Sequence, residues 1–363
     1  DLGGRRSRRD IRRHGMRIGL TLYGSLDEHS GGFRYDRKLV EGLRAAGETV
    51  DVIELPWRSY HRGALDSLDP RFREQLDVAV DVMLQDELAH PSLIGHNPQL
   101  SYPIVSVVHH LRSSEPRQLT PLYRELERRY LSTVDGVVCN SAPTRRSVRE
   151  LGVDAQTVLA PPAGDRLAPP AAPDPVTVPS PEQPLCVVFV GNITQRKGLD
   201  TLVDGVAASE AAVELTVVGR EIDGSHVADV RQSVREHGLT DRVHFLGRCS
   251  DEQLADQLRT AHVLAVPSRY EGLGIVYLEG MSFGLPVLAT RAGGATDVVT
   301  DGENGYLVEP DDPAAVGRAL TRFASDPDRF AEMSRAARRR YEDQPDWTET
   351  TARVRSLLTE VVT

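Results

Sequence analysis

Two acidic residues, Glu271 and Glu279, stand with seven residues between them in the stretch 267–281. This stretch follows an apolar run, contains a short loop with two glycines, and continues as a segment of helical character. A glycine-bearing loop that opens a helix suits an anion, because the first helical N–H groups are unsatisfied and the helix dipole is positive there. An ionised carboxylate beside it accepts hydrogen bonds from hydroxyl groups. The pattern therefore predicts a site for a ligand that carries both phosphate and hydroxyl groups.

A basic pair lies in an earlier loop of the same kind. The continuous apolar run 185–190 is typical of a buried strand, residues 191–198 form a loop that begins and ends with glycine, and a helical pattern follows. Arg196 and Lys197 in this loop are suited to bind a diphosphate, arginine through two parallel hydrogen bonds. The alternative is a basic pair that is merely solvated.

Two consecutive histidines, His109 and His110, follow another strand-like run, and Asp86 and Glu87 lie at the end of a third. Ligands of parallel α/β sheets bind beyond the carboxyl ends of the strands, so these side chains are candidates to line one site. The alternatives are structural histidines and solvated acids.

A glycine pair, Gly31 and Gly32, follows the first strand-like run and precedes a helical pattern. The segment lacks the GxGxxG pattern, so it gives little support for a nicotinamide or flavin cofactor. Glycines would let a phosphate or a sugar approach the backbone closely. A plain turn is an equally good interpretation of this segment alone.

Strand-like runs alternate with helical patterns, which predicts α/β domains with doubly wound parallel sheets. The expected strands are 16–22, 49–55, 78–84, 104–108, 136–139, 157–160, 185–190, 214–218, 243–246, 261–266 and one from 286. Helices are expected at 116–131, 142–151 and 347–362, among others. The proline-rich composition of 161–184 marks a domain boundary. We therefore expect a disordered basic leader (1–15), an N-terminal domain (16–165), a linker (166–184), a second domain (185–342) and a C-terminal helical segment (343–363).

The composition excludes several classes of protein. With 40% hydrophobic and 26% charged residues among 363, the chain has a soluble globular profile of two-domain size. The formal net charge of -10 argues against nucleic acid as a partner. The three cysteines form no CxxC pair, which favours buried thiols in a reducing, cytoplasmic setting. The arginine-rich residues 1–15 carry no apolar segment of a secretion signal, and peripheral membrane contact is their alternative role.

The motifs together resemble a known family. Gly191-Asn192, Arg196-Lys197-Gly198, the stretch Ser268–Gly274 and Glu279 are similar to the motifs of family 4 retaining glycosyltransferases of the GT-B fold, as is the turn 301–305. The resemblance spans residues 16 to about 360. It implies two Rossmann-like domains that face each other across a cleft, with the final helix crossing back onto the first domain. It also implies transfer of a hexose-type sugar from a nucleoside-diphosphate sugar to a small-molecule, saccharide or lipid acceptor, without a metal or other cofactor.

The resemblance assigns a role to each matching residue. Glu279 would bind the ribose hydroxyls and Glu271 the hydroxyls of the donor sugar, while Arg196 and Lys197 would neutralise the diphosphate. His109 matches the active-site histidine of the family, whereas His110 falls where relatives commonly have an acid. The catalytic residues implied are thus His109, Glu271, Arg196 and Lys197. The donor contacts implied are Gly31, Gly32, Gly191, Arg196, Lys197, Gly272, Leu273, Gly274 and Glu279.

Three other functions compete with this one. A retaining glycoside hydrolase would need two carboxyl groups ~5 Å apart around one bond, and it would not need a basic pair at a glycine-bearing loop. A nucleotide-sugar 2-epimerase of the two-domain α/β kind is the nearer alternative, and a sugar-nucleotide binder without enzymatic activity is the third. Only a transferase releases nucleoside diphosphate in a manner that depends on an acceptor.

Overall fold

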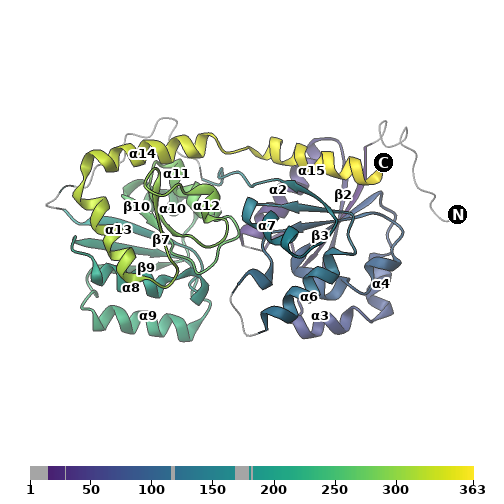
Figure 1. Ribbon diagram of the computed structural model, residues 1–363, viewed down its shortest axis with the longest axis horizontal. Helices are drawn as coiled ribbons and strands as arrows, with labels where there is room; N and C mark the ends of the chain where they lie inside the picture. The colour runs from purple at the N-terminus through teal and green to yellow at the C-terminus, as the bar shows by residue number, and fades with distance from the viewer. Residues whose placement is uncertain (1–14, 29, 116–118, 168–179, 181–182) are drawn as a thin grey trace. The chain divides into compact units, whose positions relative to one another are not determined.

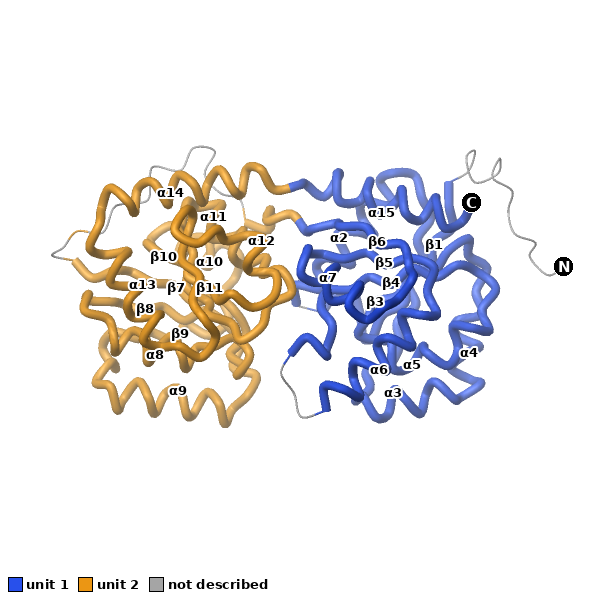
Figure 2. Tube along the Cα trace, viewed as in Figure 1, with its two compact units in different colours: residues 1–162, 345–363 blue, residues 163–344 orange. Residues whose placement is uncertain are grey.

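A computed structural model describes residues 15–28, 30–115, 119–167, 180 and 183–363, which form two compact units (Figure 2). The first unit comprises residues 1–162 and 345–363, and the second comprises residues 163–344. The sequence predicted the linker at 166–184 and the start of the C-terminal helical segment at 343. All of the expected leader except Gly15, and most of the expected linker, lie outside the described residues.

The first unit is built on a parallel six-stranded sheet with the order β2-β1-β3-β4-β5-β6. β1 lies between β2 and β3, so the strand order reverses beside it, as in doubly wound folds. Side chains at the carboxyl ends of these strands are therefore placed where such sheets bind ligands. The strands are β1 (Arg17–Tyr23), β2 (Thr49–Leu55), β3 (Val82–Asp86), β4 (Ile104–Val108), β5 (Gly136–Cys139) and β6 (Gln156–Leu159).

Helices cover this sheet, and the last helix of the chain is one of them (Figure 1). The helix α15 (Trp347–Val362) contacts α2, β5 and β6, and it buries Val354, Leu357 and Leu358 in the core of the first unit. The C-terminal helix therefore belongs to the first unit. The other helices of this unit are α2 (Gly31–Ala45), α3 (Tyr60–Asp66), α4 (Pro70–Leu76), α5 (His90–Leu93), α6 (Thr120–Leu131) and α7 (Ala142–Glu150).

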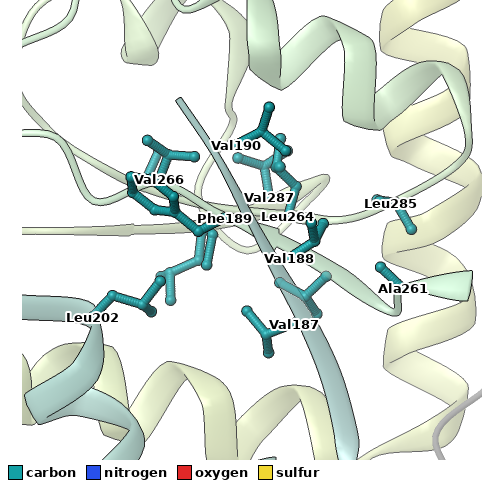
Figure 3. Packing of buried hydrophobic residues seen from close by; sticks show 14 of the residues in the cluster. Val187, Val188, Phe189, Val190, Leu202, Ala261, Leu264, Val266, Leu285 and Val287 are labelled. Carbon is teal, nitrogen blue, oxygen red and sulfur yellow. The ribbon is translucent and has the colours of Figure 1, made fainter. Parts of the chain in front are cut away.

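The second unit has its own parallel six-stranded sheet, with the order β12-β11-β10-β7-β8-β9. Val188, Phe189 and Leu264 from the central strands are almost completely buried and pack in one core (Figure 3). The strands are β7 (Leu185–Val190), β8 (Val213–Val218), β9 (Val243–Gly247), β10 (Val263–Ala265), β11 (Val287–Thr290) and β12 (Gly305–Val308). The helices are α8 (Leu199–Ala208), α9 (Gly224–Glu236), α10 (Asp251–Thr260), α11 (Ile275–Ser282), α12 (Ala295–Val298), α13 (Pro313–Ser325) and α14 (Pro327–Glu342).

Most of the expected strands are confirmed, but two predicted local features are wrong. β3 spans Val82–Asp86 instead of 78–84, because its pairing with β1 starts at Val82 and its polar last residues remain in the ladder with β4. Gly31 and Gly32 do not form a loop before a helix. Ser30 caps α2 by accepting the N–H of Phe33, so both glycines lie in the first helical turn.

Two further expectations concern membranes and thiols. Within the described residues, none of the helices combines the length and apolar character that crossing a bilayer requires. The three cysteines form no disulfide. Cys139 is buried as expected, whereas Cys186 and Cys249 are only partly buried.

Candidate active site

Three loops meet at the carboxyl edge of the second sheet, one each after β7, β10 and β11. The backbone N–H of Arg269 donates to the carbonyl of Arg196 over 2.8 Å, which joins the first two loops. The N–H of Gly294 donates to the carbonyl of Glu271 over 2.7 Å, which joins the second and third. These contacts join residues that are 73 and 23 positions apart in sequence.

Glycine is required where these loops touch. Gly198 adopts φ +68°, and a Cβ there would lie 2.1 Å from the carbonyl oxygen of Pro267. A Cβ on Gly294 would lie 1.9 Å from the carbonyl oxygen of Gly272. No side chain fits at such distances without displacing backbone. The glycines therefore allow the main-chain contacts that position the charged residues of the loops.

The basic pair and the first acid form one cluster. Nζ of Lys197 lies 2.5 Å from Oε2 of Glu271, and Nη1 of Arg196 lies 3.5 Å from the same oxygen. Ser268 donates its hydroxyl to that oxygen over 3.2 Å. Burial lowers the pKa of Lys197, against the opposing effect of the Glu271 charge. A phosphate that enters this edge would compete with Glu271 for Lys197, which would release the carboxylate to bind hydroxyl groups.

The second acid, Glu279, lies on α11, the helix that follows the loop after β10. Gly274 is the N-cap of this helix and has φ 81°. Glu279 is buried, and its charge raises the pKa of Lys197, which places it near the same cluster. Nε of Arg166 lies 3.5 Å from Oε1 of Glu279. The loop 272–274 and both acids thus belong to one edge of the second unit.

In the first unit, His109 lies directly after β4 and packs against the first turns of α2. Its Nε2 lies 3.4 Å from Oδ1 of Asp36, a carboxylate without exposed surface. A Cβ on Gly32 would lie 3.2 Å from Cδ2 of His109. Tyr35 meets the imidazole edge-on, with ring centroids 5.2 Å apart. His110 has a different environment, because its Nε2 lies 3.1 Å from Glu115.

The surrounding carboxylates keep His109 protonated. Burial lowers the pKa of His109, but the charges of Asp36, Glu87 and Asp86 outweigh it and raise this pKa to about 10. Burial, together with the neighbouring acids, raises the pKa of Asp86 well above its usual range. Because an imidazolium has no lone pair for a further proton, His109 is unsuited to act as a general base at neutral pH.

A metal ion could also use this group. Within the described residues, Asp36, Asp86 and His109 each offer a ligand atom, and these atoms lie within 4.8 Å of one another. One imidazole and two carboxylates suit several divalent transition metals. A metal at Nε2 would have to replace the proton that Asp36 stabilises there. The sequence indicated no metal site, because these three residues come from separate elements.

Comparisons with known proteins match both units. The family model "Glycosyl transferases group 1" matches residues 174–340, and "Glycosyltransferase Family 4" matches residues 29–165. The chain belongs to the family 4 glycosyltransferases. The resemblance inferred from the motifs is confirmed.

Curated relatives of this family 4 glycosyltransferase align with this chain over only part of their own length. The D-inositol 3-phosphate glycosyltransferase of Streptomyces avermitilis is 38% identical over 172 residues, which cover 45% of this chain and 37% of that protein. The GDP-mannose-dependent alpha-(1-6)-phosphatidylinositol monomannoside mannosyltransferase of Mycolicibacterium smegmatis is 32% identical over 179 residues, 47% of either chain. The chain thus spans less than half the length of these curated relatives.

Solved structures resemble this family 4 member over nearly the whole chain. Sucrose-phosphate synthase from Thermosynechococcus elongatus has a TM-score of 0.80 at 24% identity, and the match covers 95% of this chain and 99% of that one. Anabaena Alr3699/HepE in complex with UDP-glucose has a TM-score of 0.76 at 17% identity, with coverages of 95% and 100%. The two Rossmann-like domains of the GT-B fold are confirmed. Neither the family models nor these relatives support the epimerase alternative.

Two residues beside the predicted site were not foreseen from the sequence. Asp36 stands three, four and seven positions before Leu39, Val40 and Leu43, so it lies on the apolar face of α2. An acid on such a face is a signal of a buried charged partner, which is here His109. Arg166 lies in the proline-rich stretch interpreted as a linker, where no pattern suggested a role.

The charge on His109 can be tested with Asp36→Asn. We expect the pKa of His109 to fall from about 10 to neutral pH or below, because burial then opposes a weaker attraction. The wild-type imidazole should keep its proton between about pH 7 and pH 9, and the variant should lose it in or below that range. NMR titration of the imidazole measures this directly, with the exposed-site variant Asp51→Asn as control. A neutral His109 in the wild type at pH 8, or an unchanged titration in Asp36→Asn, would contradict the assignment.

Proposed function

We propose that the chain is a retaining, metal-independent glycosyltransferase that moves a hexose-type sugar from a nucleoside-diphosphate sugar to a hydroxyl acceptor. The proposal rests mainly on one observation, the cluster of Arg196, Lys197 and Glu271 at the carboxyl edge of the second sheet. Cations and a carboxylate are there within reach of one small ligand. The names of two relatives support the donor class, since HepE is described with UDP-glucose and the mannosyltransferase as GDP-mannose-dependent.

Arg196 and Lys197 would stabilise the negative charge that develops during the reaction. As the glycosidic bond breaks, the leaving diphosphate gains negative charge that must be stabilised. Lys197 and Arg196 supply positive charge, and the backbone at 272–274 leads into the N-terminus of α11. By analogy with an oxyanion hole, one such donor contributes about 3 kcal/mol in the transition state. No metal ion is needed for this role.

The carboxylates bind the neutral parts of the donor. Once a phosphate pairs with Lys197, Glu271 can accept hydrogen bonds from hydroxyls of the donor sugar. Glu279, on the same edge, accepts from the ribose hydroxyls. Arg166 lies 3.5 Å from Glu279, so the carboxylate has a cation beside it.

Retention follows from attack on the face that the leaving group vacates. The acceptor oxygen bonds to the anomeric carbon as the bond from that carbon to the diphosphate oxygen breaks. The acceptor proton passes to the leaving phosphate, which receives the electron pair of the broken bond. His109 does not take this proton, because it is already an imidazolium.

Transfer itself is tested by the release of nucleoside diphosphate from a panel of sugar nucleotides, with and without hydroxyl acceptors. We expect release that depends on an acceptor and persists in EDTA, because the cationic side chains replace a metal. A product NMR spectrum gives the anomeric configuration. Strict dependence on a divalent ion would contradict metal independence and implicate Asp36, Asp86 and His109. Release that no acceptor increases, with an isomerised sugar as product, would contradict the transferase assignment.

The ribose contact is tested with Glu279→Ala. The nucleoside diphosphate to use is chosen first among UDP, GDP, ADP and dTDP by thermal shift, since a ligand of the folded state raises the Tm. We expect Glu279→Ala to weaken its binding at least about tenfold, because the ribose hydroxyls lose a charged acceptor. Calorimetry measures this, with the exposed Glu303→Ala as the matched control. Equal affinities for wild type and Glu279→Ala would remove the ribose role.

A further inference from the structure

An arginine of the first unit lies between two tyrosine rings close to His109. Arg112 begins the short turn after β4, three positions beyond His109. Its guanidinium carbon lies over both rings, 5.1 Å from the centroid of Tyr60 and 4.6 Å from that of Tyr123. The rings meet edge to face, with centroids 4.9 Å apart and an interplanar angle of 79°. The guanidinium therefore sits in the angle that the two rings form.

This guanidinium has no acidic partner in the part of the chain that the structure describes. No carboxylate oxygen there lies within 4.0 Å of its nitrogens, and the buried Nε makes no hydrogen bond. The acids nearby bind main-chain amides instead. Glu127 accepts from the N–H of Ser113 over 3.2 Å and 3.3 Å, and Glu87 accepts from the N–H of His109 over 3.0 Å.

The ring of Tyr60, one of the two beside Arg112, is held in place by hydrogen bonds through His90. His90 Nδ1 lies 2.6 Å from the carbonyl oxygen of Glu87, and the hydroxyl of Tyr60 lies 2.9 Å from Nε2 of His90. Burial and the charge of Arg112 lower the pKa of His90 to about 4, although its bond to Glu87 opposes this. A neutral His90 donates from Nδ1 and accepts the Tyr60 proton at Nε2. The tyrosine that supports the guanidinium is therefore fixed by a chain of hydrogen bonds.

A fixed cation without a counter-charge is a recognition element for an anion. Holding a positive charge in a partly buried place costs free energy unless a partner is present. Arginine binds phosphate and carboxylate through two parallel hydrogen bonds, and aromatic stacking restricts the guanidinium without using its donors. The two rings thus prepare Arg112 for a ligand that the protein itself does not supply.

We infer that Arg112 binds an anionic group, a phosphate or a carboxylate, of the acceptor substrate. This inference rests on the proposed transferase function. The donor diphosphate already has Arg196 and Lys197 in the second unit, whereas Arg112 belongs to the first unit and follows the same strand as His109. The acceptor would then be a hydroxyl compound with a negative charge, held by Arg112 and the two tyrosines.

The direct test measures binding of inorganic phosphate by calorimetry to protein saturated with a nucleoside diphosphate, so that the second unit is occupied. We expect Arg112→Gln to weaken this binding at least about tenfold, because a charge-assisted pair of hydrogen bonds is lost. Arg62→Gln removes an exposed cation from the same helix as Tyr60 and should change the affinity less than about threefold. Arg112→Lys keeps the charge but loses the planar fork, and its affinity should be intermediate. Wild-type protein that binds no phosphate, or Arg112→Gln that binds it normally, would overturn the inference.

A kinetic comparison shows whether Arg112 binds a phosphate or a carboxylate of the acceptor. It also tests the anion site at Arg112 separately from the transferase function. Glucose 6-phosphate, glucuronate and glucose are offered as acceptors, and kcat/KM is measured for each protein. Transfer that favours a charged acceptor in the wild type, but not in Arg112→Gln, supports the inference and tells phosphate from carboxylate. Equal transfer to glucose by both proteins, without preference for charge, overturns it and leaves the transferase function intact. Phosphate binding could be lost only in Arg112→Gln while no acceptor is glycosylated by any of the proteins. This result would support an anion site at Arg112 and contradict the transferase function. Should the Tm of Arg112→Gln drop sharply, Arg112→Lys decides, because it keeps a cation beside the two rings.

Discussion

The ion pair between Lys197 and Glu271 is the interaction on which the rest of the candidate site depends. Both side chains are largely buried, at 13% and 12% exposure, and each offsets part of the desolvation cost of the other. Removing Glu271 would take from the buried Lys197 the carboxylate at 2.5 Å, whereas removing Lys197 would still leave Glu271 with Arg196 and Ser268. A ligand that brings its own negative charge can take over the lysine and release the carboxylate. The pair thus combines the two groups on which the proposed donor site relies, a cation for phosphate and an acceptor for hydroxyls.

The first unit also pairs a buried cation with an acid at the carboxyl edge of its sheet. His109 faces Asp36 there as Lys197 faces Glu271, and in both cases an acid stabilises a buried cation. Arg112 differs from both, because its support is aromatic and its charge remains without an acidic partner among the described residues. That difference is why Arg112, and not His109, is assigned to a negatively charged substrate group.

The sequence predicted the alternation of strands and helices well, because continuous apolar runs such as Leu185–Val190 are long and bounded by glycine or proline. The resemblance to family 4 also predicted that Arg196, Lys197 and Glu271 would share a site, and the structure brings the three side chains together. The sequence could not predict where β3 ends, because the last residues of this strand are polar yet buried. Nor could it predict that the Arg112 guanidinium lies over the rings of Tyr60 and Tyr123. These residues come from three elements that only the tertiary fold brings together.

The central claim is that the carboxyl edge of the second sheet binds a nucleoside diphosphate. Amide hydrogen exchange, measured by mass spectrometry with and without the nucleoside diphosphate that raises the Tm most, tests it most directly. The account predicts slower exchange in the loops 191–198, 267–275 and 291–294, and unchanged exchange at the opposite edge, in 209–212. Protection at 209–212, or none in the three loops while the nucleotide is bound, would contradict it.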